Sequence, residues 1–132
     1  MLTEKDYCDY DTCVALKDLG YVGTGEECSY FGAYFNNGND IFADDLNNNE
    51  IAVDEYLRVP LFLAQKWLRE EKGIHIAPRI YLYHDINLDE HTSWECTIYV
   101  EWSAIYTIGK SLTYEDALLL GVKEAVKILK EK

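Results

Sequence analysis

The sequence predicts a single small α+β domain over residues 1–132, with about three helices packed on a three-stranded, mainly antiparallel sheet. The predicted order is helix, strand, helix, strand, strand, helix. Segments with apolar residues at helical spacing are interleaved with segments that alternate with a period of two. A chain of 132 residues has room for one core, and its 48% hydrophobic and 14% aromatic residues supply enough apolar surface to offset chain entropy.

The first predicted helix covers residues 9–19. Asp9 or Asp11 can cap its start, and Gly20 follows as a stop. Its apolar stripe consists of Ala15, Leu16 and Leu19. This spacing places one face of the helix against a core.

The aromatic-rich stretch of residues 27–35 predicts the first strand, and the Asn37-Gly38 pair after it indicates a turn. Residues 39–58 show no clean period, so we expect mostly loop with one short turn. A connection of this length inside a small domain usually carries a function or is disordered.

The second predicted helix follows Pro60, since proline is tolerated at a first helical position, and it ends before Gly73. Its predicted buried stripe consists of Leu61, Ala64, Trp67 and Leu68. The final helix begins near Thr113, which forms a capping-box-like pair with Asp116. Its predicted buried face consists of Leu118, Val122, Ala125 and Leu129.

Two further strands are predicted between these helices. In residues 74–85 the apolar positions alternate, and Pro78 argues for an edge strand or a bulge. The apolar face of this strand is predicted to hold Ile74, Ile76, Ile80 and Leu82. Residues 94–102 alternate as a half-buried antiparallel strand does, with residues 85–93 as the hairpin loop.

The net charge of −12 is concentrated in one part of the chain. Residues 1–56 hold 13 Asp and Glu against Lys5 and Lys17, a net of −11. Residues 57–132 hold 11 acidic and 10 basic residues, a net of −1. We therefore expect no direct nucleic-acid binding and no binding to an anionic membrane, because both need a basic surface.

The N-terminus lacks a basic start followed by an apolar core, and no apolar run approaches the length that spans a bilayer. We expect a soluble, cytoplasmic protein. The four cysteines are then expected to be thiols, since that compartment is reducing.

The stretch DDLNNNEIAVDEY, residues 44–56, raises the question of calcium. Counted from Asp45, the first, third and fifth positions carry oxygen ligands. However, Glu50 stands where the sharp turn needs glycine, and Tyr56 stands where a bidentate glutamate is required. A solvated polar loop is the preferred interpretation, with calcium binding kept as an alternative.

No catalytic, cofactor-binding or metal-binding residue is assigned, and no cofactor is expected. The chain has no CxxC or HxxxH pair, and the glycines of residues 20–27 follow a helix rather than a strand. His84 and Asp85 could act as an acid–base pair, but a polar pair at a strand end is the more frequent case. An enzyme is therefore the less favoured class.

The acidic part of the chain gives the one functional hypothesis. Its candidate interaction surface consists of Asp40, Asp44, Asp45, Glu50, Asp54 and Glu55. Such a surface either only keeps the protein soluble or attracts a basic protein partner. The hypothesis is a non-enzymatic acidic protein-interaction module. The alternative is a small-molecule or metal-binding domain using the aromatic-rich sheet or the Asp45 loop, and the oligomeric state stays open.

One segment resembles a signature of a family of small uncharacterised proteins from gut bacteria and their phages and mobile elements. In this family a proline opens a helix with a Lys-Trp-Leu-Arg-Glu run, and a strand follows. The matching residues are Pro60, Ala64, Lys66, Trp67, Leu68, Arg69, Glu70, Ile74 and Ile76. Residues 16–21 and 113–129 are also similar, so about two-thirds of the chain is covered.

The resemblance implies shared architecture rather than chemistry, and it transfers no functional residue. The Asn- and Asp-rich loop departs from the family pattern. The association with phages implies a small protein that modulates a host or defence component.

Overall fold

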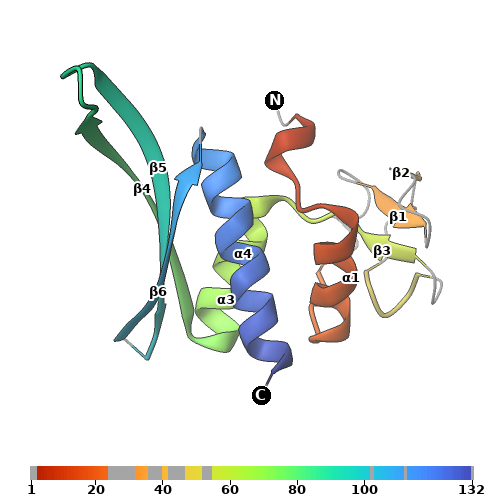
Figure 1. Cartoon of the computed structure of the whole chain (residues 1–132). Helices are drawn as coiled ribbons and strands as arrows, with labels where there is room; N and C mark the ends of the chain where they lie inside the picture. The colour runs from red at the N-terminus through yellow and green to blue at the C-terminus, as the bar shows by residue number, and fades with distance from the viewer. Residues whose placement is uncertain are drawn as a thin grey trace. The chain divides into compact units, whose positions relative to one another are not determined.

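The computed structural model describes residues 3–23, 32–35, 40–41, 47–51, 55–101, 103–111 and 113–131 (Figure 1). The chain divides into two compact units, Met1–Ala64 with Leu129–Lys132, and Gln65–Ile128. We describe each unit by itself. The expectation of one domain over residues 1–132 stays a prediction.

The first unit contains the 3-10 helix η1 (Glu4–Asp6), the helix α1 (Tyr10–Asp18) and a small sheet. The sheet has the order β2-β1-β3, with β1 (Ala33–Phe35) paired antiparallel to both β2 (Asp40–Ile41) and β3 (Glu55–Leu57). The short strands β2 and β3 lie in the region for which the sequence predicted mostly loop.

Helix α1 begins and ends where the sequence predicted. The Asp9 carboxylate accepts a hydrogen bond from the Thr12 backbone N–H at 2.9 Å, which satisfies one of the open donors of the first turn. Gly20 has a φ of 102°, a left-handed conformation that glycine adopts without strain. Cys13 and Leu16 are fully buried, so this face of the helix belongs to the core of the unit.

The second unit is built on a sheet of order β4-β5-β6, antiparallel throughout. Helix α3 (Leu61–Lys72) begins in the first unit and leads into β4 (Ile74–His84). The chain continues through β5 (Glu90–Val100) and β6 (Ser103–Ser111). Helix α4 (Tyr114–Lys130) follows, and the Asp116 N–H donates to the Thr113 hydroxyl at 3.1 Å, as its predicted cap requires.

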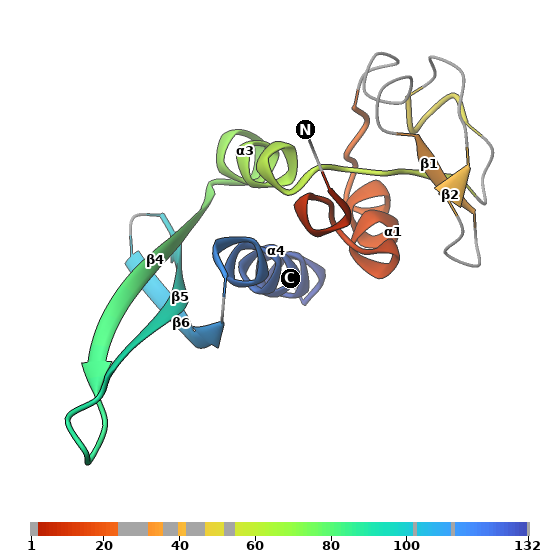
Figure 2. The ribbon, with the colours of Figure 1, turned by 90° about the horizontal axis from the view of Figure 1, so that it is seen from above.

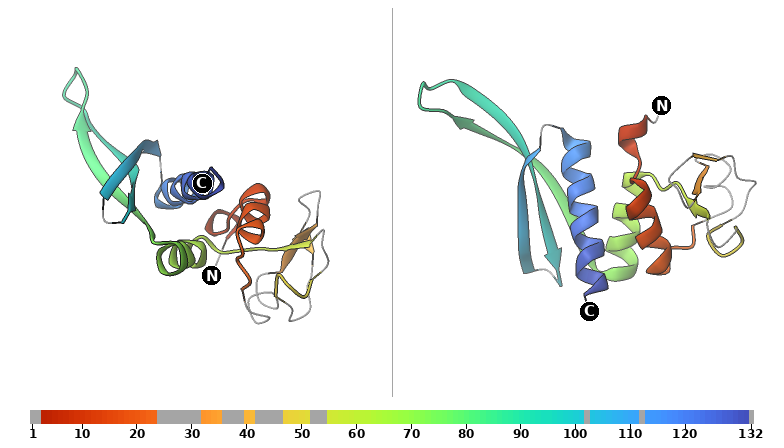
Figure 3. Two further views of the ribbon diagram at one scale, coloured as in Figure 1. Left: turned by 90° about the horizontal axis from the view of Figure 1, so that it is seen from below. Right: turned by 45° about the vertical axis from the view of Figure 1, so that its right-hand side comes forward.

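The β4–β5 hairpin is longer than the rest of the sheet. Its strands pair without a break from Ile74 opposite Val100 to His84 opposite Glu90. The third strand, β6, pairs with β5 only from Trp94 to Val100. Residues 81–93 therefore form a two-stranded extension, which we call the hairpin arm; Figures 2 and 3 show it continuing beyond β6 and α4.

Helix α4 covers one face of the sheet at very close range. Gly121 is buried, and a Cβ added to it would lie 2.5 Å from both the Cys96 sulfur and the Ile76 Cγ2. Glycine at this position therefore sets how closely the helix approaches the sheet. The buried residues of this layer are Ile74, Ile76, Cys96, Ile98, Ala117, Leu118, Val122, Ala125 and Val126.

The α+β class and the three α-helices are confirmed for the part of the chain that the structure describes. The single three-stranded sheet is wrong in its composition. The strand predicted at residues 27–35, described from residue 33, pairs with neither of the other two predicted strands. The strand beside β5 is instead β6, which the sequence analysis did not identify. The partner could not be assigned from the sequence because the periodicity of a strand does not encode which strand it pairs with.

The predicted buried face of β4 is correct only for its first half. Ile74 and Ile76 are 1% and 6% exposed, whereas Ile80 and Leu82 are 53% and 62% exposed. Alternation predicts which residues share a face of a strand, but it does not predict how far a helix covers that face. Ile80 lies opposite Trp94, the last residue of β5 that pairs with β6, and Leu82 lies beyond that pair on the hairpin arm.

The substitution Gly121→Ala is expected to destabilise the protein, although alanine favours helices more than glycine does. The gain in helix propensity is about 1 kcal/mol, and forcing a methyl group into a filled layer costs about 1–3 kcal/mol. We expect a net loss of about 1 kcal/mol in the free energy of unfolding, measured by urea denaturation.

The control Lys127→Ala, at an exposed position of the same helix, should change stability by less than about 0.5 kcal/mol. In a Cys96→Ala background the cost of Gly121→Ala should be smaller, because one of the two clashing atoms is gone. An undiminished cost in that background would contradict the proposed clash.

Candidate interaction site

The structure describes only part of the predicted acidic interaction surface. Asp44, Asp45 and Asp54 lie outside the described residues. Asp40 is placed by its backbone in β2, opposite Tyr34 of β1. Glu50 is exposed in a turn, and Glu55 is half-buried in β3.

The turn of residues 47–51 is held by its own side chains. The Asn47 side-chain oxygen accepts a hydrogen bond from the Asn49 N–H at 2.9 Å, which is a typical Asx turn. The Glu50 carboxylate accepts from the Asn47 N–H at 3.4 Å. These contacts use the side-chain oxygens of Asn47 and Glu50 to order the backbone.

Asn48, in the middle of the same acidic stretch, is only 3% exposed and joins three segments of the first unit. Its side-chain amide donates to the Tyr21 carbonyl at 2.7 Å, and its side-chain oxygen accepts from the Leu57 N–H at 3.0 Å. Its own N–H donates to the Val22 carbonyl at 2.8 Å. Asn48 therefore satisfies buried backbone groups that secondary structure leaves open.

These hydrogen bonds bear on the calcium alternative. Of the three oxygen ligands that the sequence offers, Asp45 lies outside the described residues, and the Asn47 oxygen already accepts a hydrogen bond. Among the described residues, no group of three His, Cys, Asp or Glu side chains is arranged to hold a metal ion. The calcium alternative stays a prediction.

The basic side chains near the acidic segment make contacts within the protein. The Lys17 ammonium donates to the Glu55 carbonyl at 2.8 Å and lies 5.0 Å from the centre of the Tyr56 ring. A cation over an aromatic ring is attracted to the negative face of the ring. Lys17 is thereby turned toward β3 rather than toward solvent.

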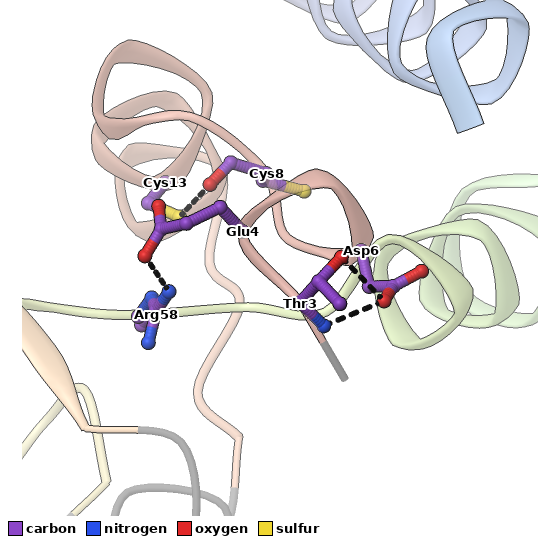
Figure 4. Close-up of polar contacts among 6 residues, drawn as sticks. All are labelled: Thr3, Glu4, Asp6, Cys8, Cys13 and Arg58. Atoms are coloured by element: carbon purple, nitrogen blue, oxygen red, sulfur yellow. Dashed lines mark hydrogen bonds and ion pairs between the residues drawn. The ribbon is translucent and has the colours of Figure 1, made fainter. Parts of the chain in front are cut away.

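Arg58 is held in the same way (Figure 4). Its guanidinium forms an ion pair with Glu4 at 2.7 Å and lies 3.9 Å from the centre of the Tyr7 ring. The Arg58 side chain is 17% exposed and that of Glu4 80% exposed. The pair fastens η1 to the segment after β3, and it leaves the Glu4 carboxylate facing solvent.

The described cysteines, Cys8, Cys13 and Cys96, are free thiols in buried positions. Cys13 donates to the Cys8 carbonyl oxygen at 3.7 Å (Figure 4). A hydrogen bond with the Cys13 thiol and then burial raise the pKa of Cys8 well above its usual range. Burial raises the pKa of the Cys96 thiol to about 11. At neutral pH neither Cys8 nor Cys96 supplies a thiolate.

The polar pair predicted at His84 and Asp85 is arranged differently in the structure. The Asp85 carboxylate pairs with the His91 ring nitrogen at 2.8 Å, and it also accepts from the Asn87 and Asp89 N–H groups. The hydrogen bond from His91 is the main cause that lowers the pKa of Asp85. These contacts close the tip of the hairpin arm, and the sequence analysis missed His91 because it treated residues 85–93 as loop.

A pocket of about 320 Å³ lies in the second unit, and the sequence analysis did not identify it. Its lining is mostly apolar and comes from α3, β4 and β5: Arg69, His75, Ile76, Ala77 and Tyr99. His75 and Tyr99 are directly opposite each other on neighbouring strands. Aromatic residues at alternate strand positions could have suggested such a groove, but not its place beside α3.

Comparison with protein-family models, with curated proteins and with solved structures found no match for this chain. Within the described ranges, no helix combines the length and the apolarity that a membrane crossing requires.

The substitution Asn48→Ala is expected to lower the free energy of unfolding by about 2–4 kcal/mol, because it leaves the Tyr21 carbonyl and the Leu57 N–H buried without this partner. Urea denaturation measures the loss. Asn49→Ala is the matched control: Asn49 is exposed, and its backbone rather than its side chain makes the hydrogen bond of this turn. Equal effects of the two substitutions would contradict a special role for Asn48.

Proposed function

We propose that this chain is a non-enzymatic, acidic protein-interaction module that binds a basic protein. The acidic segment, residues 40–55, is the proposed docking surface, with Asp40, Asp44, Asp45, Glu50, Asp54 and Glu55 as its charged groups. The observation that carries the proposal is the net charge of −11 in residues 1–56 against −1 in the remainder. Such an asymmetric charge speeds the approach of a basic partner and orients it.

Two features of the described residues support this proposal. The basic side chains Lys17 and Arg58 are held by Glu55, Tyr56, Glu4 and Tyr7. Acidic side chains of the first unit are exposed, including Asp11, Asp18 and Glu50. Among the described residues of the first unit, Lys17 and Arg58 are thus turned toward the protein, whereas Lys5 is exposed together with these acidic side chains.

The resemblance to small proteins of phages and mobile elements guides the choice of partner. We propose a host or defence protein with a basic surface as the first class to test. Tagged protein is incubated with host-cell lysate at low salt, retained proteins are eluted with increasing salt, and the main one is purified for titration calorimetry.

The combined variant Asp44→Asn, Asp45→Asn, Asp54→Asn and Glu55→Gln should weaken binding to this partner at least about tenfold at low salt. It should also flatten the dependence of affinity on salt, because fewer ion pairs are screened. The matched control neutralises four carboxylates elsewhere: Glu70→Gln, Glu71→Gln, Glu124→Gln and Glu131→Gln. This control carries the same net charge and should bind nearly as the unmodified protein does.

Unchanged binding of the first variant would remove the acidic segment from the proposal. Equal weakening of both variants would assign the effect to net charge rather than to this surface.

A second candidate function is the binding of a small molecule, and the pocket of the second unit favours it. Its volume is near the lower end of ligand-sized cavities, and its apolar walls with a few polar groups are typical of ligand sites. Tyr99 offers a ring for stacking and Arg69 a guanidinium for a carboxylate. We therefore propose aromatic carboxylates as the ligand class.

A ligand that binds only the folded protein raises its melting temperature. A panel of aromatic carboxylic acids should raise the melting temperature of the unmodified protein, and Ala77→Phe, which fills the pocket, should abolish the shift. Tyr114→Phe, remote from the lining residues, is the control. The absence of any shift, or a shift that persists in Ala77→Phe, would contradict this candidate.

A further inference from the structure

The hairpin arm exposes large apolar side chains on a two-stranded ribbon. Leu82 and Tyr83 of the arm are 62% and 46% exposed, and Ile80, at the base of the arm opposite Trp94, is 53% exposed. A two-stranded ribbon is only marginally stable in water without a third strand or a covering helix. Pairing with a further strand would therefore cover exposed apolar side chains of the arm and stabilise its two-stranded ribbon.

Three observations show which backbone groups of β4 point away from β5. In an antiparallel pair, residues alternate between those that hydrogen-bond to the facing strand and those whose N–H and C=O point outward. The Asp85 N–H donates to the Asp89 carbonyl at 3.1 Å, so this pair is a bonded one. The Ile76 carbonyl accepts from the Gln65 side chain of α3 at 2.8 Å, so it points outward.

Pro78 is the third observation, because proline has no N–H and is tolerated where that group would face outward from an edge strand. All three agree that the even-numbered residues of β4 direct their backbone groups outward. Near the base of the strand this edge is blocked by Gln65 and by Pro78. From Ile80 through Leu82 to His84, no strand of the described residues pairs with this edge.

We propose that this edge pairs with the same edge of a second copy of the chain, antiparallel about a twofold axis at Leu82. In this register Ile80 faces His84 of the second copy, Leu82 faces Leu82 of the second copy, and each such pair exchanges two backbone hydrogen bonds. The two hairpins then form one continuous sheet, and the exposed Ile80 and Leu82 side chains cover one another.

The charges and rings of the arm fit this register. Arg79, which pairs with Glu95 of its own hairpin and whose side chain is still 69% exposed, faces Asp85 of the second copy, and Tyr81 faces Tyr83 of the second copy. A shift by two residues would instead place Arg79 opposite an uncharged residue, Tyr83 or Asn87 of the second copy. Cross-strand pairs of opposite charge and of aromatic residues are the favourable ones in antiparallel sheets.

The other edge of the arm is unsuited to the same pairing. Thr92 lies opposite Leu82, so its backbone groups point outward from β5. With a twofold axis at Thr92, however, Glu90 would face Trp94 of the second copy, and Trp94 already pairs with Ser111 of β6. With the axis at Glu90 instead, two Glu90 carboxylates would face each other, and like charges across strands are destabilising. The edge of β4 is therefore the pairing edge, and Thr92 supplies a matched control for Leu82.

The first test is sedimentation of the full chain over a range of concentrations. We expect the mass to rise from the 15.3 kDa of the monomer to twice that value, with a dissociation constant on the order of 10 µM because the interface is small.

Added salt should strengthen the dimer, because each copy carries a net charge of −12. The proposed complex with a basic protein responds to salt in the opposite direction, so the two proposals fail independently.

Leu82→Lys should weaken the dimer at least about tenfold, since two ammonium groups would meet at the twofold axis. Thr92→Lys adds the same charge on the facing strand of the same arm and should leave the dimer nearly unchanged. Leu82→Pro, which removes the outward N–H, should also weaken it, and Thr92→Pro is its control.

Hydrogen exchange tests the register directly. The amides of Ile80, Leu82 and His84 should become protected as concentration rises, whereas those of Tyr81 and Tyr83 should be protected at every concentration because they bond to β5. Protection of Tyr81 and Tyr83 in the variants also shows that the arm remains folded. A chain that stays monomeric at about 1 mM, or that loses the dimer equally in Leu82→Lys and Thr92→Lys, overturns the proposal.

Discussion

The second unit depends on the uninterrupted pairing of β4 with β5. This ladder fixes which face of each strand points to α4 and which backbone groups point to the open edge. Ile76, Cys96 and Ile98 are thereby placed beneath α4, where the missing side chain of Gly121 lets the helix approach. The same alternation continues along the hairpin arm, which α4 does not cover. The strand face that is buried at Ile74 and Ile76 is therefore exposed at Ile80 and Leu82.

The first unit depends on side-chain hydrogen bonds more than on strands. Its strands have two or three residues each, so their ladders satisfy few backbone groups. Asn48 supplies what the ladders lack, by bonding the backbone at Tyr21, Val22 and Leu57. The acidic segment, residues 40–55, thus contains the buried side-chain amide of Asn48, which has a structural role.

The two proposed surfaces use different physical forces. The acidic segment acts through charge at a distance, so its effect weakens in salt. The edge of β4 acts through backbone hydrogen bonds and apolar contact at short range, and salt favours it by screening the repulsion between acidic copies.

The sequence by itself determined the local features: a cap at Asp9 or Asp11, Thr113 as a second cap, Gly20 and Gly73 as stops, and an edge strand or a bulge at Pro78. The structure chose Asp9 as the cap and placed β4 at the edge of its sheet. The sequence also determined the uneven charge, because charge is a sum over residues. Only the tertiary structure decided that β6 pairs with β5, that α4 covers Ile76 but not Ile80, and that His91 pairs with Asp85. Those outcomes depend on which segments meet in space, and a pattern along one segment carries no information about its distant partner.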